Sequence, residues 1–174
     1  IYIYKVKLLH IYYIKIMSKK IRIKLKRPHV FIPMSADIFH YGHINILKKS
    51  KKYGSIIVGL MTDKGIKSYK KKLPFMKYKE RKLILNSIKF VNLVIPIPGL
   101  KYVEFAKKYK FDFFIHGDDW KKGPQADQRK YLILAMKKWG GRVIDIKYTK
   151  GISSSKIKKN IKNSNKAYIT HELL

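Results

Sequence analysis

From His29 to His43 the chain reads HVFIPMSADIFHYGH, an apolar run followed by small and polar residues and then by two histidines. The short apolar run, bounded by polar residues, predicts a buried strand at His29–Pro33. Gly42 and the polar residues before it predict a tight connection that opens a helix. A strand, a short connection and a helix in this order begin an α/β domain.

The same alternation of short apolar runs and longer amphipathic stretches continues toward the carboxyl end. It predicts a parallel five-stranded sheet flanked by helices, with ligands bound beyond the carboxyl ends of the strands. A lysine-rich run at Lys67–Lys72 is expected to form a mobile loop. The remaining predicted strands are Ser55–Met61, Asn92–Pro96, Phe111–His116 and Arg142–Lys147, and the predicted helices are Gly42–Tyr53, Lys77–Phe90, Leu100–Tyr109, Gln125–Trp139 and one that begins between Ser153 and Ser155.

We divide the chain into a basic amino-terminal extension at 1–27, one α/β domain at 28–162 and a tail at 163–174 that is expected to fray after Asn163. Residue 1 is Ile, and Met17 is a candidate start, so residues before Met17 are a candidate non-native segment. Lysines interrupt the apolar residues between Ile1 and Met17 before the ~18 residues that a membrane span needs. We therefore expect no membrane association, although an enzyme held on a membrane by Ile1–Lys26 is an open alternative.

The net charge of +31 raises the question of nucleic-acid binding. The 41 basic residues include only five arginines, and the lysines are spread over the whole chain. Reading of bases and bidentate binding of phosphate favour arginine, so we interpret most of this charge as a solvated surface and expect no nucleic-acid partner. The chain has no cysteine, which suits a cytoplasmic protein.

Two segments predict phosphate binding. His40 and His43 lie three residues apart at a helix start, where unpaired N–H groups attract anions, and Gly42 lets a phosphate approach the backbone. The second segment, GISSS at Gly151–Ser155, places hydroxyl groups at another helix start. Each segment alone could be ordinary helix capping or packing. Together they predict a triphosphate held between two helix amino termini.

The pair of motifs, His-x-Gly-His and Ile-Ser-Ser-Ser, resembles the nucleotidyltransferase superfamily that includes the cytidylyltransferases, from about Val30 to Ile161. Further stretches are similar to small cytidylyltransferases, among them Thr62-Asp63 and His116–Trp120. The resemblance implies a Rossmann-like fold, and a CMP transfer from CTP to a small phosphonate or phosphate ester with release of pyrophosphate. It also implies Mg²⁺ arriving with CTP and a homodimer.

By resemblance, the catalytic residues are His40, His43, Lys70 and Arg81, with Lys67, Lys71 and Lys72 competing for the role of Lys70. No protein-held metal is expected, although Asp118 and Asp119 could bind one. His116 is interpreted as a strand-end residue. The residues implied for nucleotide binding are Met34, Ser35, Asp37, Gly42, Asp63, Gly117, Asp118, Trp120, Ile152, Ser153, Ser154 and Ser155.

The sequence leaves two questions open, namely which acceptor the protein uses and whether the nucleotide is CTP or ATP. Cytidylyltransferases of glycerol 3-phosphate usually carry Arg-Thr-Glu before Gly-Ile-Ser, whereas this chain reads Tyr148-Thr149-Lys150, which favours the phosphonate type. The run from Gly123 to Arg129 is expected to shape the acceptor pocket. The alternatives are an adenylyltransferase of the same superfamily and a non-catalytic basic nucleic-acid-binding protein with an arm at Lys19–Arg27.

Overall fold

The computed structural model describes residues 23–122 and 125–171. Residues 1–22 of the expected extension, including Met17, lie outside the described residues, as do Gly123, Pro124 and the last three residues of the tail. The elements are β1 (His29–Met34), α2 (Tyr41–Ser50), η1 (Lys51–Tyr53), β2 (Ser55–Met61), α3 (Asp63–Lys70), α4 (Tyr78–Asn86), β3 (Leu93–Ile97), α5 (Tyr102–Tyr109), β4 (Phe113–Gly117), η2 (Asp118–Lys121), α6 (Ala126–Lys137), β5 (Arg142–Ile146) and α7 (Ser154–His171).

The five strands form one parallel sheet in the order β3-β2-β1-β4-β5. The chain builds outward from β1 to β3, returns across the sheet, and adds β4 and β5 on the other side of β1. The predicted α/β fold class and the five predicted strands are confirmed, with bounds that differ by at most two residues at either end. This order creates a crevice beyond the carboxyl ends of β1 and β4, where neighbouring loops diverge.

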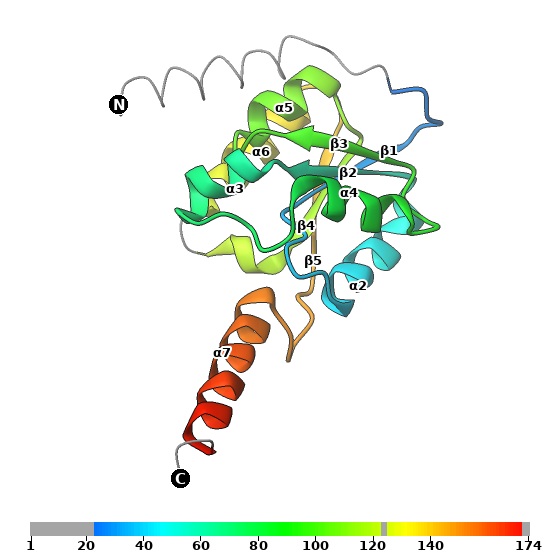
Figure 1. Ribbon diagram of the computed structural model, residues 1–174. Coiled ribbons are helices and arrows are strands. Elements are labelled where there is room, and N and C mark those ends of the chain that lie inside the picture. The colour runs from blue at the N-terminus through cyan, green and yellow to red at the C-terminus, as the bar shows by residue number, and fades with distance from the viewer. Residues whose placement is uncertain (1–22, 123–124, 172–174) are drawn as a thin grey trace.

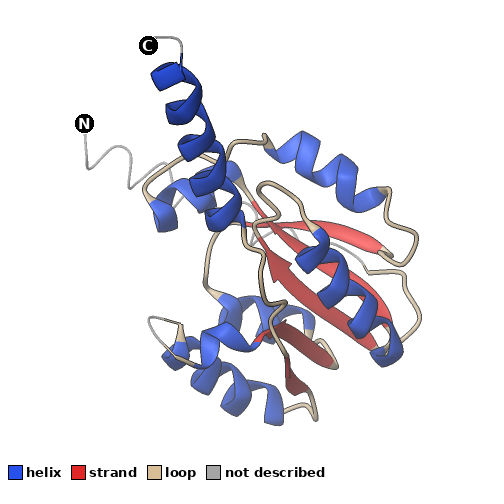
Figure 2. Cartoon of the chain, turned by 90° about the horizontal axis from the view of Figure 1, so that it is seen from below, coloured by secondary structure: helices blue, strands red, loops and turns tan. Residues whose placement is uncertain are grey.

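Helices cover both faces of the sheet (Figures 1 and 2). Successive residues of β1 point to opposite faces, so Phe31 belongs to one buried cluster while Val30 and Ile32 belong to the other. The cluster of Phe31 packs α3, α5 and α6 against the sheet. The second cluster packs α2 through Leu47 and α4 through Leu85. Burial on both faces explains why the strands read as continuous apolar runs.

Three expectations about helices are wrong. Lys67–Lys70 belong to the helix α3, whose apolar contacts come from Gly65 and Ile66 near its start, so the lysine-rich end obscures the helical pattern. The helix α4 ends at Asn86 and not at Phe90, and the Ser87 hydroxyl donates to the carbonyl of Leu83 just beyond the helix end. The last helix continues to His171, where the sequence predicts fraying after Asn163.

The residues before β1 contact the domain, although the sequence assigns them to a separate extension. Ile23 and Leu25 pack against the cluster that contains Phe31. The Arg27 guanidinium donates to Asp112 Oδ1 at 2.6 Å and to the Lys110 carbonyl at 3.1 Å. Among the described residues, no helix has both the length and the apolar content to cross a membrane.

Candidate active site

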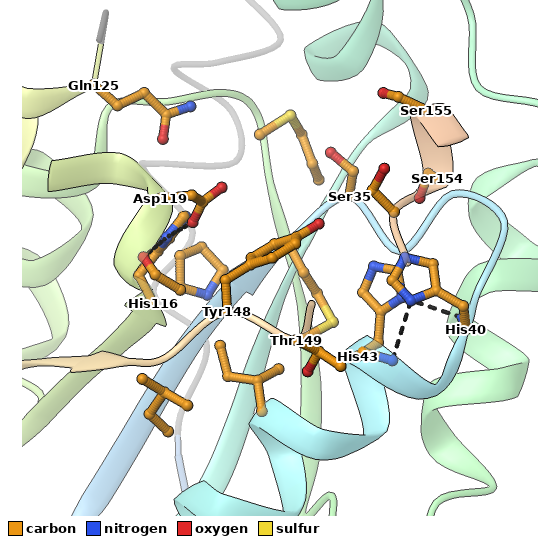
Figure 3. A pocket seen from close by; sticks show the side chains of 18 of the residues that line it. Ser35, His40, His43, His116, Asp119, Gln125, Tyr148, Thr149, Ser154 and Ser155 are labelled. Atoms are coloured by element: carbon orange, nitrogen blue, oxygen red, sulfur yellow. Dashed lines mark hydrogen bonds and ion pairs between the residues drawn. The ribbon is translucent and has the colours of Figure 1, made fainter. Parts of the chain in front are cut away.

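A cavity of about 340 Å³ opens at the carboxyl ends of β1, β4 and β5 (Figure 3). Its position matches the crevice that the strand order creates. It brings together residues from both halves of the chain. The residues singled out from the sequence that line it are Met34, Ser35, His40, Gly42, His43, Lys70, Gly117, Ser153, Ser154 and Ser155.

His40 and His43 are fixed by the first turn of α2. The ring nitrogen Nδ1 of His40 accepts the backbone N–H of Gly42 at 3.1 Å, and Nδ1 of His43 accepts the backbone N–H of His40 at 3.2 Å. The two ring centroids are 4.0 Å apart. A Cβ atom on residue 42 would lie 2.8 Å from Cε1 of His40, so glycine is required for the His40 ring to fold over the helix start.

The two histidines are neutral hydrogen-bond donors. Burial lowers the pKa of His40, and burial together with the neighbouring His40 lowers the pKa of His43 to about 4. Because each Nδ1 accepts a backbone N–H, the proton of each neutral ring is on Nε2. Each Nε2–H group is thus available to donate to an anion, next to the amino terminus of α2.

The serine motif forms the start of α7 on the same side of the cavity as the histidines (Figure 3). Ser153 Oγ accepts the backbone N–H of Lys156 at 3.1 Å, which caps the helix. Ser154 Oγ donates to the Asp37 carbonyl at 2.7 Å. Ile152 lies outside the cavity lining, and its Cγ2 would lie 3.5 Å from a Cβ on residue 42, so it packs the start of α7 against that of α2.

Lys70 is the lysine of the Lys67–Lys72 run that lines the cavity. It is the last residue of α3, and Lys71 after it adopts a left-handed conformation that ends the helix. Partial burial and the neighbouring Lys158 lower the pKa of Lys70, whereas Asp37 opposes this effect. The position singles out Lys70 among the four competing lysines.

Arg81 and Asp63 bind each other outside the cavity lining. The Arg81 side chain is fully buried and its NH2 group bonds Asp63 Oδ1 at 2.5 Å. Its other N–H groups donate to the carbonyls of Met76, Ser35 and Met61. In this arrangement Arg81 supports the backbone beneath the site and presents no surface to a ligand.

Of the residues at the end of β4 and directly after it that are predicted to bind the nucleotide, some line the cavity and others lie outside it. Asp118 Oδ1 accepts the backbone N–H of Tyr148 at 2.8 Å, and Asp118 is absent from the lining. Trp120 is 2% exposed and its Nε1 donates to Asp145 Oδ1 at 2.7 Å. Asp119, whose side chain is 57% exposed, lines the cavity in their place.

Sequence reasoning missed several lining residues. His116 stacks on Trp120 with ring centroids 4.4 Å apart, and burial lowers its pKa against the opposing effects of Gly117, Asp119 and Asp145. From the sequence we interpret His116 only as a strand-end residue, although its place at the carboxyl end of β4 lies at the edge of the sheet where ligands bind. Tyr69, Tyr102 and Lys147 also line the cavity without being singled out from the sequence. Asp119, Gln125, Tyr148 and Thr149 line it too, and the sequence analysis names them only as a possible metal ligand, as part of the Gly123–Arg129 run and as a departure from the Arg-Thr-Glu pattern.

Within residues 23–122 and 125–171 no three His, Asp or Glu side chains come together as a metal site. Of the carboxylates around the cavity, Asp37, Asp63 and Asp145 are each bonded to a cation of the protein. Asp119 is the acidic residue of the cavity lining.

Comparison with known proteins gives similarities over the region that carries the cavity. A family described as cytidylyltransferase-like matches residues 32–160. Glycerol-3-phosphate cytidylyltransferase of Staphylococcus aureus (strain NCTC 8325 / PS 47) is 36% identical over 127 residues, which cover 72% of this chain and 88% of that protein. Ethanolamine-phosphate cytidylyltransferase of Arabidopsis thaliana is 33% identical over 140 residues, which cover 77% of this chain and 32% of that protein.

A solved structure has a similar fold. The lipopolysaccharide core biosynthesis protein from Thermoplasma volcanium GSS1 superposes with a TM-score of 0.55 at 25% identity, over 71% of this chain and 98% of that chain. Both the histidine motif and the serine motif fall within the segment that the family match covers.

Proposed function

This nucleotidyltransferase belongs to the cytidylyltransferase-like family, and on that premise we propose that it transfers CMP from CTP to a small phosphate ester with release of pyrophosphate. The observation that carries the proposal is the meeting of two helix amino termini, those of α2 and α7, at one cavity that also holds His40, His43 and Lys70. Such a set of donors suits a triphosphate.

In the proposed reaction a phosphate oxygen of the acceptor attacks the α-phosphorus of CTP. One P–O bond forms to the acceptor as the bond to the bridging oxygen of the β-phosphate breaks, and pyrophosphate carries away the bonding electrons. The protein supplies no nucleophile. The Nε2–H groups of His40 and His43 donate to phosphate oxygens, and Lys70 offsets the negative charge of the transferring group.

Mg²⁺ enters the proposal as a companion of CTP. When bound, it would neutralise charge on the triphosphate and on the leaving pyrophosphate. Asp119 is the carboxylate of the lining that could reach such an ion or its water ligands. The other near carboxylates keep their bonds to Arg81, Arg129 and Lys158.

The acceptor is proposed to be a phosphate ester such as glycerol 3-phosphate or ethanolamine phosphate, because the curated relatives are named for these substrates. The cavity wall opposite the histidines carries His116, Asp119 and Gln125, with Tyr148 between the two sides (Figure 3). By the family resemblance, Tyr148 stands where an arginine is usual and Lys150 where a glutamate is usual. A phosphonate acceptor is the finer alternative, to be decided by assay.

The test is pyrophosphate release with Mg²⁺ and either CTP or ATP, against glycerol 3-phosphate, ethanolamine phosphate, phosphocholine, 2-hydroxyethylphosphonate and 2-aminoethylphosphonate. Release with CTP and one phosphate ester, abolished by EDTA, is the expected result. Release with a phosphonate only would move the acceptor to that class. Release with ATP only, or no release together with tight nucleic-acid binding, would contradict the proposal.

A further inference from the structure

The carboxylate of Asp37 connects three segments that surround the cavity. Asp37 itself does not belong to the cavity lining. Oδ1 accepts the backbone N–H groups of Phe75 and Met76 at 2.9 and 3.1 Å, and Oδ2 accepts from Lys158 Nζ at 2.7 Å. The side chain is 5% exposed. Its partners therefore belong to the segment before α4 and to α7, whereas Asp37 itself belongs to the connection from β1 to α2.

The backbone around Asp37 is held in an uncommon conformation. Ala36 and Ile38, on either side of it, have φ angles of 51° and 54°, in the left-handed region that residues other than glycine seldom adopt. Such conformations persist only where the surrounding structure fixes them. The turn directs the Asp37 carboxylate toward Lys158 while the Asp37 carbonyl accepts the hydroxyl of Ser154.

Two residues of α7 bond to Asp37 from one helix face. Ser154 and Lys158 are four residues apart, so their side chains lie one turn above the other. Ser153, Ser154 and Ser155 line the cavity. Lys158 Nζ also lies 4.6 Å from the centroid of the Phe75 ring, which connects α7 to the segment before α4 a second time.

We propose that Asp37 is a positioning residue, which clamps the start of α7 and the segment 71–77 in place so that the donors of α7 lie beside those of α2 at the cavity. The Asp37–Lys158 ion pair is the decisive part of the clamp. Removal of Lys158 leaves the Asp37 carboxylate, which is 5% exposed, without its cation. Removal of the Asp37 charge leaves the ammonium group of Lys158, which is 31% exposed, without its anion. Misplaced donors bind a triphosphate poorly, because binding requires both helix starts at once. This inference rests on the proposed function only for the identity of the nucleotide.

The experiment uses the full chain as wild type, Asp37→Asn, Lys158→Met and the double variant. Lys159→Met is the matched control, because Lys159 is an exposed lysine on the same helix. Amide hydrogen exchange is measured without nucleotide, and the Kd for CTP with Mg²⁺ is measured by calorimetry. We expect each single variant to speed exchange about tenfold in residues 154–160 and 71–78, and to raise the Kd about tenfold. We expect the control to match the wild type in both measurements and the double variant to lose less affinity than the two single losses combined.

Lys158→Met keeps the test decisive if Asp37→Asn does not fold, because Lys158 lies on the surface of α7 with 31% of its side chain exposed. Wild-type exchange in Lys158→Met would overturn the clamp. Faster exchange with an unchanged Kd would overturn its role in binding. A CTP affinity lost in Asp37→Asn but kept in Lys158→Met would instead mean direct contact between Asp37 and the nucleotide. Failure of the wild type to bind CTP would count against the proposed function, while hydrogen exchange would still report on the clamp.

Discussion

At the scale of single residues, the histidine pair serves two purposes at once. His40 is the N-cap of α2 through its Nδ1, and the same bond sets the Nε2–H group free toward the cavity. The sequence showed the pair, its glycine and its helix start, because these are local in the chain. The sequence could not show which of Asp118 and Asp119 lines the cavity. The side chains of neighbouring residues in a turn point in different directions, and those directions depend on the backbone conformation.

We predict that His40→Ala and His43→Ala each reduce kcat about 10²- to 10³-fold, because each removes a donor to the developing charge. His40→Ala should also lower the free energy of unfolding by about 1 kcal/mol, since it removes the cap. His40→Asn is the matched control, because the asparagine oxygen can replace Nδ1 as the cap, whereas its shorter side chain ends before the position of the imidazole Nε2. Steady-state kinetics and urea unfolding measure the two effects. Near wild-type turnover in both alanine variants would exclude the proposed role.

A second prediction concerns the pH dependence of stability. The pKa of His43 falls from its ordinary value of 6.5 to about 4 in the folded chain, chiefly through burial. The unfolded chain therefore binds more protons, so the stabilisation is complete above pH 6.5 and is lost as the pH falls toward 4. Urea unfolding at intervals from pH 7 to pH 4 should show a smaller loss for His43→Gln than for the wild type. Parallel curves would mean that His43 titrates normally.

At the scale of elements, strands were more predictable than helices. Strands buried on both faces, such as Ser55–Met61, are recognisable in the sequence as runs of β-branched and other apolar residues. This pattern does not depend on which strands lie beside them. The helix α3 was missed because only Gly65 and Ile66 among its residues are buried, and its stability comes from the Thr62 cap and from contact with its neighbours. A tertiary cause of this kind leaves little trace in the local sequence.

Arg81 shows how one side chain fixes several elements. It bonds the loop after β1 through Ser35, the end of β2 through Met61 and the start of α3 through Asp63. Arg81→Met should lower the free energy of unfolding by about 3–5 kcal/mol, because it leaves a carboxylate and several carbonyls without their donor.

The control is Lys79→Met, an exposed change on the same helix, and the measurement is the midpoint of urea unfolding. If Arg81→Met instead abolished turnover with unchanged stability, the residue would have to contact substrate, as the family resemblance implies.

At the scale of the whole molecule, the net charge of +31 causes electrostatic repulsion among the positively charged side chains of the folded chain. The chain has 41 basic and 10 acidic residues, so its cations far outnumber its carboxylates. Salt screens such repulsion within a Debye length of about 10 Å at 0.1 M. We predict that the Tm rises as NaCl increases from 20 to 500 mM, and that KCl gives the same rise, because the effect follows ionic strength. A Tm that falls over this range would mean that ion pairs such as Asp37–Lys158 outweigh the repulsion.

The position of β1 in the middle of the sheet sets an order in which the parts of the cavity can assemble during synthesis. Its pairing with β2 joins His29 to Ser55, whereas its pairing with β4 joins Val30 to Phe113. The first half of the sheet can therefore assemble on the ribosome well before β4 emerges, because local contacts form first. The cavity needs Ser153–Ser155 as well. The histidines at the start of α2 can therefore fold first, and the cavity is completed only when the serine motif joins them.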